Sequence, residues 1–496
     1  MNVGKVLEKT VEKFGNQPFI FFKDEAITFA EMEKRVNKFA NALLRLGLQK
    51  GNHIGVILPN CPEYAIAYLS IYKIGATIIP IDFWLKEEEK LGIISHAKIK
   101  FLITEALTDS FLEKLKEKVS SLEKIISRQK VSTILSWEEI VEKESDKLTP
   151  GEIKDEDIST IYYTSGTTGV PKGIVWNYRH LDNAAMIMNY FCDVGEKDVD
   201  ICPIPLSHAG GSVPLFTHLE YGGSIVLMEK FQPLEFLKNV QKYKVTWSNI
   251  VPSMFAAIVH LKDFEKYDLS SIRFFASFGA PGAPELLEKF HRQCPNGEVW
   301  SGYGLMETAP PNTVPPIGKA KRGSVGMAPP WIQVKIFDEN SREVETGNVG
   351  EVVIKGWVVM NGYYKQPELT AQVIKNGWFH TGDLGKLDED GYLYIVGRKK
   401  EVIIVGGLNV HAVEVENVIS QHPRVLEVAV IGIPDKMRGE VVKAFIILKP
   451  GEKVDKQEIL DFCRLHLTHF KIPKGIQFRD SFPRTSVGKI KKSVLK

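Results

Sequence analysis

The sequence from Tyr163 to Gly173 is Tyr-Thr-Ser-Gly-Thr-Thr-Gly-Val-Pro-Lys-Gly, and it offers little apolar surface to a core. Hydroxyl side chains and glycines fill most of its positions, and Lys172 adds a positive charge. Glycine lets successive backbone N–H groups turn toward one point, and hydroxyl groups add donors around it. The stretch therefore predicts a phosphate-binding loop built from Thr164, Ser165, Gly166, Thr167, Thr168, Gly169 and Lys172.

Two other interpretations fit this loop less well. A Walker loop requires Gly-Lys-Ser/Thr, whereas Pro171 precedes Lys172 and Gly173 follows it. A flexible linker is rarely preceded by an apolar, β-prone run such as residues 158–163. The loop closely resembles the phosphate-loop signature of the adenylate-forming superfamily, which includes acyl- and aryl-CoA synthetases, firefly luciferases and peptide-synthetase adenylation domains.

The composition limits the protein class. The 496 residues suffice for roughly three domain-sized units, and 63 basic against 61 acidic side chains argue against a nucleic-acid partner. Five scattered cysteines without zinc-type spacing predict buried thiols in a reducing compartment. Residues 3–14 predict an amphipathic helix, not a signal peptide, and no run approaches the ~18 apolar residues of a transmembrane segment. We expect a cytoplasmic protein, and the sequence leaves a homodimer open.

Strands and helices alternate before and after the loop, which predicts an α/β domain of two parallel-type βα sheets. In such folds ligands bind at the carboxyl ends of the strands. The Lys- and Glu-rich stretch 111–144 predicts an exposed helix. The expected strands are 53–58, 76–81, 99–104, 199–204, 224–228, 245–247, 272–278 and 298–300, and the expected helices are 62–74, 210–219, 233–243, 252–261 and 284–294.

The pattern changes twice in the last third of the chain. Short β-prone runs separated by turns predict a small antiparallel or barrel-like subdomain over 324–397. Within it, Asp388-Glu-Asp-Gly391 predicts a hairpin turn, because a calcium loop would need a later glutamate. The remaining residues, 401–496, predict a small α+β domain of their own. The resemblance implies that this domain is mobile, that residues 1–397 bind ATP and the acid, and that 398–400 form the hinge.

Further motifs carry the resemblance along nearly the whole chain, in the family's order. In Gly302-Tyr-Gly-Leu-Met-Glu-Thr308, it implies that Tyr303 stacks on adenine and that Glu307, with Thr164, holds Mg²⁺. Magnesium prefers carboxylate and phosphate oxygens. This chain departs from the family by having Met306 where threonine is usual and Ser301 where an amide is frequent.

The resemblance also assigns the remaining contacts of the nucleotide and CoA. Ser277-Phe-Gly-Ala-Pro281 implies close backbone approach to adenine and the acyl group at Gly279, Ala280 and Pro281. Asp383 and Arg398 would bind the ribose, and Lys400 would belong to the hinge. Val405-Gly-Gly-Leu-Asn-Val410 would line the pantetheine channel with Gly406 and Gly407, although the family's aromatic-proline pair is replaced here by His411-Ala412.

Two residues complete the expected site. In Pro483-Arg-Thr-Ser-Val-Gly-Lys489, the resemblance implies that Lys489 bridges the carboxylate and the α-phosphate, where a cation offsets charge as two anions meet. In Pro205-Leu-Ser-His208, it implies a gating or positional role for His208 at the acyl entrance.

Together these motifs imply an AMP-forming, ATP-dependent carboxylic acid:CoA ligase that uses Mg²⁺ and CoA. Residues Gly210-Gly211-Ser212 leave room for a chain, so we expect a medium- or long-chain fatty acid, with an aryl acid as the alternative. A stand-alone enzyme that loads a carrier protein and a luciferase-like oxidase stay open. Retention of the motif residues argues against an inactive nucleotide sensor. We expect the acid pocket to involve Trp247, Pro252, Phe278, Gly279 and Trp300.

Overall fold

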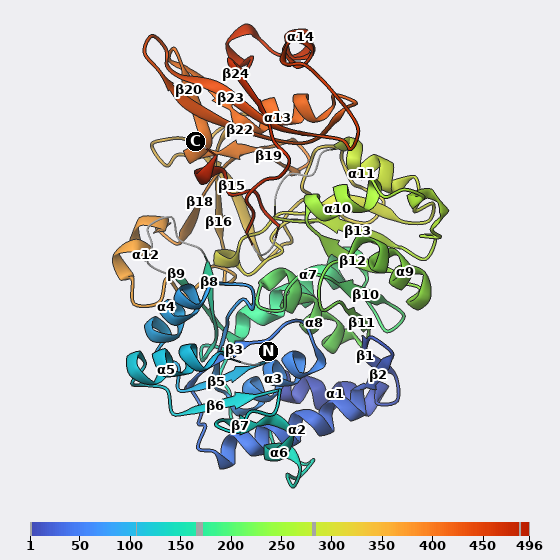
Figure 1. Ribbon diagram of the computed structural model, residues 1–496, viewed down its shortest axis with the longest axis vertical. Coiled ribbons are helices and arrows are strands. Elements are labelled where there is room, and N and C mark those ends of the chain that lie inside the picture. The colour runs from blue at the N-terminus through green and yellow to red at the C-terminus, as the bar shows by residue number, and fades with distance from the viewer. Residues whose placement is uncertain (1, 106, 165–171, 280–283, 486–487, 496) are drawn as a thin grey trace.

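Two seven-stranded sheets form the core of the first 300 residues in the computed structural model, which describes residues 2–105, 107–164, 172–279, 284–485 and 488–495 (Figure 1). The first sheet has the order β7-β6-β5-β3-β4-β8-β9, and only its β8–β9 pair is antiparallel. Its strands are β3 (His53–Ile57), β4 (Thr77–Pro80), β5 (Phe101–Thr104), β6 (Lys124–Ser127), β7 (Leu135–Ser136), β8 (Ile158–Thr164) and β9 (Lys172–Asn177).

The second sheet has the order β14-β13-β12-β10-β11-β1-β2 and is parallel except for its terminal β1–β2 pair. Both sheets therefore confirm the expected parallel-type architecture. The strands of the second sheet are β1 (Pro18–Phe22), β2 (Glu25–Thr28), β10 (Val199–Cys202), β11 (Ser224–Leu227), β12 (Trp247–Ile250), β13 (Phe274–Ser277) and β14 (Glu298–Ser301).

Buried helices join the two sheets into one body. Helix α3 (Pro62–Ile74) is apolar on every side, as expected for a helix enclosed in a core, and Tyr68 and Tyr72 pack on Phe216 of α8 (Ala209–Tyr221). The other helices of this part are α1 (Val3–Phe14), α2 (Phe29–Arg45), α4 (Glu87–Ala97), α5 (Asp109–Lys118), α6 (Trp137–Val141), α7 (Asp182–Cys192), α9 (Pro233–Tyr243), α10 (Pro252–Val259) and α11 (Pro284–His291).

The predicted helix over 111–144 is wrong. Helix α5 ends at Lys118, and the stretch beyond it supplies β6, β7 and the short helix α6. Strand β6 pairs in parallel with β5, with Phe101 opposite Lys124 and Ile103 opposite Ile126. A partner strand more than twenty residues away thus provides the hydrogen bonds that overrule the local Lys- and Glu-rich pattern.

A five-stranded antiparallel sheet follows and confirms the expected small β subdomain. It comprises β15 (Gln333–Phe337), β16 (Gly350–Lys355), β17 (Ile374–Lys375), β18 (Trp378–Leu387) and β19 (Leu393–Arg398), with α12 (Pro367–Val373) before β17. Asp388 accepts backbone hydrogen bonds from Asp390 and Tyr392, which confirms a hairpin turn there.

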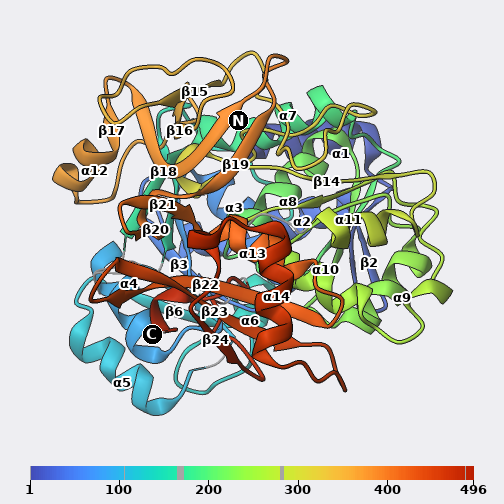
Figure 2. The same ribbon diagram turned by 90° about the horizontal axis from the view of Figure 1, so that it is seen from above.

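The C-terminal part is an α+β unit that lies at one end of the molecule (Figure 1) and in front of the rest in the view from above (Figure 2). Its sheet is antiparallel except where β24 pairs in parallel with β23. Its elements are β20 (Val402–Val405), β21 (Leu408–His411), α13 (Ala412–Ser420), β22 (Val425–Asp435), β23 (Gly439–Leu448), α14 (Lys456–His466) and β24 (Gly475–Phe478). The domain boundaries expected from the sequence, including the hinge at 398–400, stay predictions.

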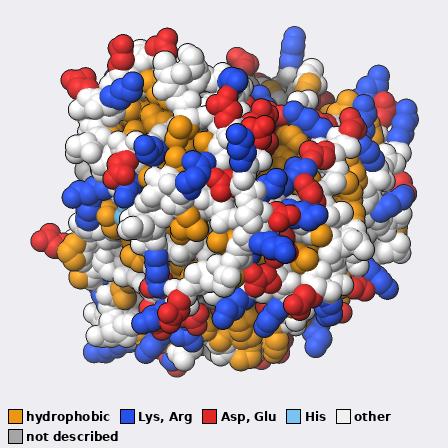
Figure 3. All heavy atoms as spheres, turned by 90° about the horizontal axis from the view of Figure 1, so that it is seen from below, with side chains coloured by type: hydrophobic (Ala, Val, Ile, Leu, Met, Phe, Trp, Pro, Cys, Tyr) orange, Lys and Arg blue, Asp and Glu red, His pale blue; other side chains and the backbone are white. Residues whose placement is uncertain are grey.

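The surface agrees with the balanced composition. On the face seen from below, basic and acidic side chains are interspersed over the molecule (Figure 3). The five cysteines are buried and free, as expected from their scattered positions. In the described ranges, no helix has the length and apolar run needed to cross a membrane.

Candidate functional site

The phosphate-type loop joins two antiparallel strands of the first sheet. Thr164 is the last residue of β8, and it pairs with Lys172, the first residue of β9. These two residues therefore lie side by side at the base of the loop. The predicted loop residues Ser165, Gly166, Thr167, Thr168 and Gly169 lie outside the described residues, as do Ala280 and Pro281.

Glu307 lies beside this base and is held by a residue that the sequence motifs did not indicate. It belongs to the 3₁₀ turn η3 (Met306–Thr308), and its Oε1 accepts a hydrogen bond of 3.1 Å from the hydroxyl of Tyr363. The ammonium of Lys172 lies 5.8 Å from the centre of the Tyr363 ring. Tyr363 thus contacts both the expected magnesium ligand and the phosphate-loop lysine. The signal for it was weak: an aromatic pair after Gly362.

Met306, which stands where the family motif usually has threonine, directs its side chain away from the site. Its side chain is buried in the main core, while its backbone carbonyl accepts a 2.6 Å hydrogen bond from the indole of Trp176. The backbone of Met360 also donates to the carbonyl of Glu307 at 2.8 Å. The turn that presents Glu307 is therefore fixed by its main chain. Ser301, the other departure, is buried as the last residue of β14.

The expected ribose contacts form one hydrogen-bonded group. Asp383 of β18 pairs with Arg398 of β19, and Arg398 Nε donates to Asp383 Oδ1 at 2.8 Å. The hydroxyl of Tyr303 donates to Asp383 Oδ2, also at 2.8 Å. Burial, followed by the charge of Asp383, holds the pKa of Tyr303 well above its ordinary value, so this hydroxyl keeps its proton. Each oxygen of the carboxylate retains a lone pair for another donor.

The C-terminal domain brings Lys489 to this group. A Cβ added to Gly279, whose φ is +87°, would lie 3.0 Å from Lys489 Cε, so glycine is required there. Ser253 at the start of α10 donates a 3.4 Å hydrogen bond to the carbonyl of Gly488. Although Lys489 keeps exposed surface, desolvation and then the charge of Arg398 lower its pKa, while Asp383 and Glu307 act in the opposite direction.

His208 caps α8 next to this lysine. Its Nδ1 accepts a 3.0 Å hydrogen bond from the backbone N–H of Gly210. Desolvation, and then the positive charge of Lys489, lower the pKa of His208 to about 3. A neutral imidazole fits the expected positional role and does not fit general acid–base catalysis near neutrality.

The structure does not bring the expected pantetheine-channel residues to the same place. Gly406 and Gly407 form the two-residue turn between β20 and β21, with φ of +58° and +83°. Both are exposed, and an added Cβ at either would meet no atom within 4 Å. Lys400 is exposed in the 3₁₀ turn η4 (Lys399–Glu401). In this arrangement the C-terminal domain presents Lys489, not the glycine turn, to the nucleotide-type residues.

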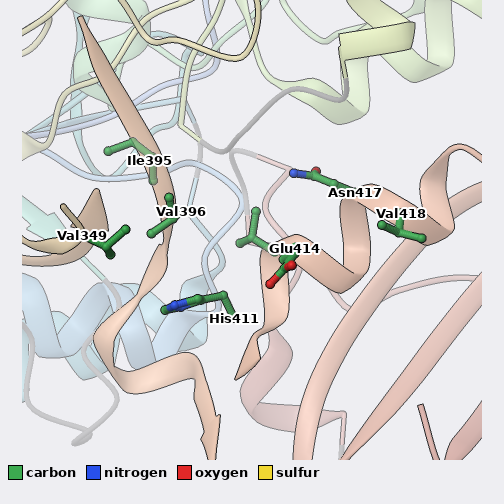
Figure 4. A pocket seen from close by; sticks show the side chains of 8 residues that line it. Val349, Ile395, Val396, His411, Glu414, Asn417 and Val418 are labelled. Carbon is green, nitrogen blue, oxygen red and sulfur yellow. The ribbon is translucent and has the colours of Figure 1, made fainter. Parts of the chain in front are cut away.

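A separate pocket of about 390 Å³ lies between the β subdomain and the C-terminal domain. Figure 4 shows Val349, Ile395 and Val396 on one side and Asn417 and Val418 on the other, with His411 and Glu414 between them. Because its walls come from both sides of residues 398–400, the pocket depends on this arrangement of the two domains.

The protein side chains near Glu307 would bind a magnesium ion only together with oxygen atoms of a bound nucleotide. Among the residues with described positions, no group of three or more His, Cys, Asp or Glu side chains is gathered for a metal. Glu307 offers a carboxylate with one oxygen held by Tyr363, and Thr164 lies at the nearby loop base. Such a sparse set matches Mg²⁺, which commonly takes one or two carboxylates plus substrate phosphates.

Comparison with known proteins identifies the family. The AMP-binding enzyme family matches residues 7–364, and the AMP-binding enzyme C-terminal domain matches residues 414–489. The long-chain-fatty-acid–CoA ligase of Bacillus subtilis (strain 168) is 33% identical over 98% of this chain and 92% of its own length.

Several solved structures cover all of this chain at 28% identity. The anthranilate CoA ligase AuaEII in complex with anthranoyl-AMP has a TM-score of 0.94, and 96% of its chain is covered. ATP-bound MatB from Rhodopseudomonas palustris has a TM-score of 0.90, and 98% of its chain is covered. From the family match over most of its length, the chain belongs to the AMP-binding enzyme family.

Proposed function

We propose that this protein is an AMP-forming carboxylic acid:CoA ligase. The carboxylate attacks the α-phosphorus of ATP and pyrophosphate leaves; the thiol of CoA then attacks the acyl carbonyl and AMP leaves. The observation that carries this proposal is the position of Lys489, which reaches Gly279 from the C-terminal domain and lies within electrostatic reach of Arg398, Asp383 and Glu307. A single mobile cation at that point suits a step that joins two anions.

The chain's own residues divide the work of adenylation. Asp383 and Arg398 bind the ribose hydroxyls, and Tyr303, fixed through its hydroxyl, presents its ring to adenine. Thr164, Lys172 and the loop between them bind the phosphates. Glu307 and Thr164 would hold Mg²⁺, which would neutralise phosphate charge when bound. Contacts to the nucleotide and CoA come from Ser165, Gly166, Thr167, Thr168, Gly169, Gly279, Ala280, Pro281, Lys400, Gly406 and Gly407.

The second half-reaction requires the C-terminal domain to turn. Lys489 and the Gly406–Gly407 turn belong to the same small domain, yet both are assigned to one acyl carbonyl. Of these two, Lys489 lies beside Gly279 in this structure, whereas the Gly406–Gly407 turn is exposed. The domain therefore rotates about Arg398–Lys400 between the steps, and His208 gates the acyl entrance as a neutral side chain.

The reaction is tested by measuring products. Pyrophosphate should appear with ATP and an acid alone, and AMP release should require CoA. Release of ADP and phosphate would contradict the proposal. AMP release that requires a carrier protein, with no response to CoA, would support the carrier-loading alternative instead. The cytoplasmic location and the homodimer remain expectations.

The names of similar proteins support two different acids. The Bacillus subtilis relative is named for long-chain fatty acids, which agrees with our first expectation from the sequence. The AuaEII structure is a complex with anthranoyl-AMP, whose acyl group is aromatic, which agrees with the alternative. The choice between them depends on the residues that would surround the acyl group.

A further inference from the structure

The face of the second sheet that packs against α7 and α8 extends from the region of Lys489 toward the interior. Strand pairing places Asn249, Ala276 and Trp300 in one row near the carboxyl ends of β12, β13 and β14. Trp247 and Phe274 stand one row deeper on the same face. Side chains on one face of a strand are two residues apart, so the rows are separated by about 7 Å.

The upper row connects to the site through aromatic contacts. Gly279, beside Lys489, directly follows Phe278, whose ring meets the Trp300 ring edge-on at 6.2 Å. Between Asn249 and Trp300 stands Ala276, whose methyl group is the smallest side chain of this row. An acid whose carboxylate lies near Lys489 would therefore extend along Phe278 and Trp300 toward the interior.

The lower row closes this path. The Trp247 and Phe274 rings lie 5.8 Å apart, and Phe274 stacks parallel to Trp300 at 6.3 Å. On the helix side, the ring of His218 from α8 lies 4.9 Å from Trp247. All four side chains are at most 3% exposed. Because these packed rings stop an acid that enters along Phe278 after about one row, they favour a ring-sized group over the extended chain of a long fatty acid.

The same rings carry polar atoms that the protein leaves without partners. Within the described part of the chain, Trp247 Nε1, Trp300 Nε1 and both ring nitrogens of His218 are buried and have no hydrogen-bond partner. An indole N–H can only donate, and an unmet buried donor is strongly unfavourable. Burial lowers the pKa of His218 to about 3, so this imidazole is neutral and offers one donor and one acceptor.

We propose that the acid substrate is a short aromatic carboxylic acid bearing a hydrogen-bond acceptor on its ring, such as a hydroxyl, a carbonyl or a ring nitrogen. This inference rests on the proposed ligase function and specifies its acid. The ring lies along Phe278, Ala276 and Trp300, and the acceptor meets an indole N–H or His218. The structure thus favours the aryl acid, our alternative from the sequence, over the fatty acid.

The first test compares acids in the pyrophosphate-release assay. Benzoate, a hydroxybenzoate, octanoate and palmitate would each be titrated with saturating ATP. We expect kcat/KM for the hydroxybenzoate to exceed that for benzoate by about tenfold, which is the contribution of one hydrogen bond. We expect it to exceed the kcat/KM for palmitate by a larger factor. A preference for palmitate or octanoate would overturn this inference and leave the ligase function intact. If none of the four acids supported pyrophosphate release, the ligase function would be overturned and the inference with it.

The second test removes one donor while keeping an aromatic ring. The two variants are Trp300→Phe and Trp247→Phe. In at least one of them, kcat/KM should fall about tenfold for the hydroxybenzoate and stay within about twofold of the parent value for benzoate. Trp137→Phe, a buried indole stacked on Phe39 away from this face, is the matched control. Equal losses for both acids in both variants would overturn the role of the indole donors.

The third test opens the closed end of the path. Phe274→Leu should raise the kcat/KM for octanoate relative to benzoate, because it replaces the ring that ends the path with a smaller side chain. Phe275→Leu is the control, since Phe275 is the next residue of the same strand and packs on the opposite face, against Phe255 and Phe290. Equilibrium unfolding of both variants monitors folding. An identical acid preference in the two folded variants would contradict the position assigned to the substrate ring.

Discussion

The hydroxyl of Tyr363 lies 3.1 Å from Oε1 of Glu307 and donates a hydrogen bond to it, although the two residues are 56 positions apart in the chain. Tyr363 stands just before α12 and forms an isolated β-bridge with Ile174 of β9. The tyrosine therefore links the expected magnesium ligand to the strand that follows the phosphate loop.

Tyr363→Phe should weaken magnesium-dependent binding of ATP. Loss of one hydrogen bond to a carboxylate leaves Glu307 less well oriented, which corresponds to about a 3- to 10-fold rise in the Mg²⁺ concentration for half-saturation. Calorimetric titration of ATP at several Mg²⁺ concentrations measures this without turnover. Tyr364→Phe is the matched control, because Tyr364 contacts the His53 and His96 rings instead. Equal shifts in both variants would show that the hydrogen bond to Glu307 has no specific role.

Lys489→Ala should slow adenylation by about 10²–10³ while sparing thioester formation from supplied acyl-adenylate. The reason is that in this structure Lys489 lies beside Gly279 while the Gly406–Gly407 turn of the same domain is exposed. Rapid-quench measurement of each half-reaction separates the two effects. Lys491→Ala, two residues further along the same tail, is the control. A comparable loss in both half-reactions would contradict the assignment of Lys489 to adenylation alone.

As pH rises, the rate of adenylation should fall at a lower pH than it would if Lys489 had the pKa of an ordinary lysine. The pKa of Lys489 is lowered by desolvation and by Arg398, so its charge is present below this pKa and is lost as pH rises through it. The pH profile of kcat/KM for ATP reports this group in the free enzyme. Lys489→Arg keeps a charge at every working pH and should move the alkaline limb upward. An unchanged limb in that variant would assign the ionisation to another group.

Lys400→Pro should slow thioester formation far more than adenylation. Proline fixes φ near −65° and restricts Lys399, which opposes rotation of the C-terminal domain from the arrangement that presents Lys489. Lys400→Ala removes the side chain and leaves the backbone free, so it serves as the control. Separate rates for the two half-reactions decide the matter: acyl-CoA formation by the proline variant at the parent rate would remove the need for a hinge at this position.

The sequence alone determined most of the architecture and the order of the site motifs. Alternating strand and helix patterns depend on local spacing, and short-range signals placed helix α3 at Pro62–Ile74 and α9 at Pro233–Tyr243. Motif residues such as Asp383 and Arg398 could be paired in advance only through resemblance, and the β18–β19 hairpin brings them together. Local pattern failed at residues 124–127, where the pairing partner Phe101–Thr104 is distant.

Only the tertiary structure decided which side chains share an environment. Tyr363 has no local pattern that points to Glu307, because its role follows from the path of the chain between β16 and α12. Likewise, His218 and Trp247 meet because α8 packs across a parallel sheet whose strands are joined by long connections. Hydrogen bonding and ring contact require proximity in space. Proximity between residues far apart in sequence is set by the packing of layers, which no short window of sequence contains.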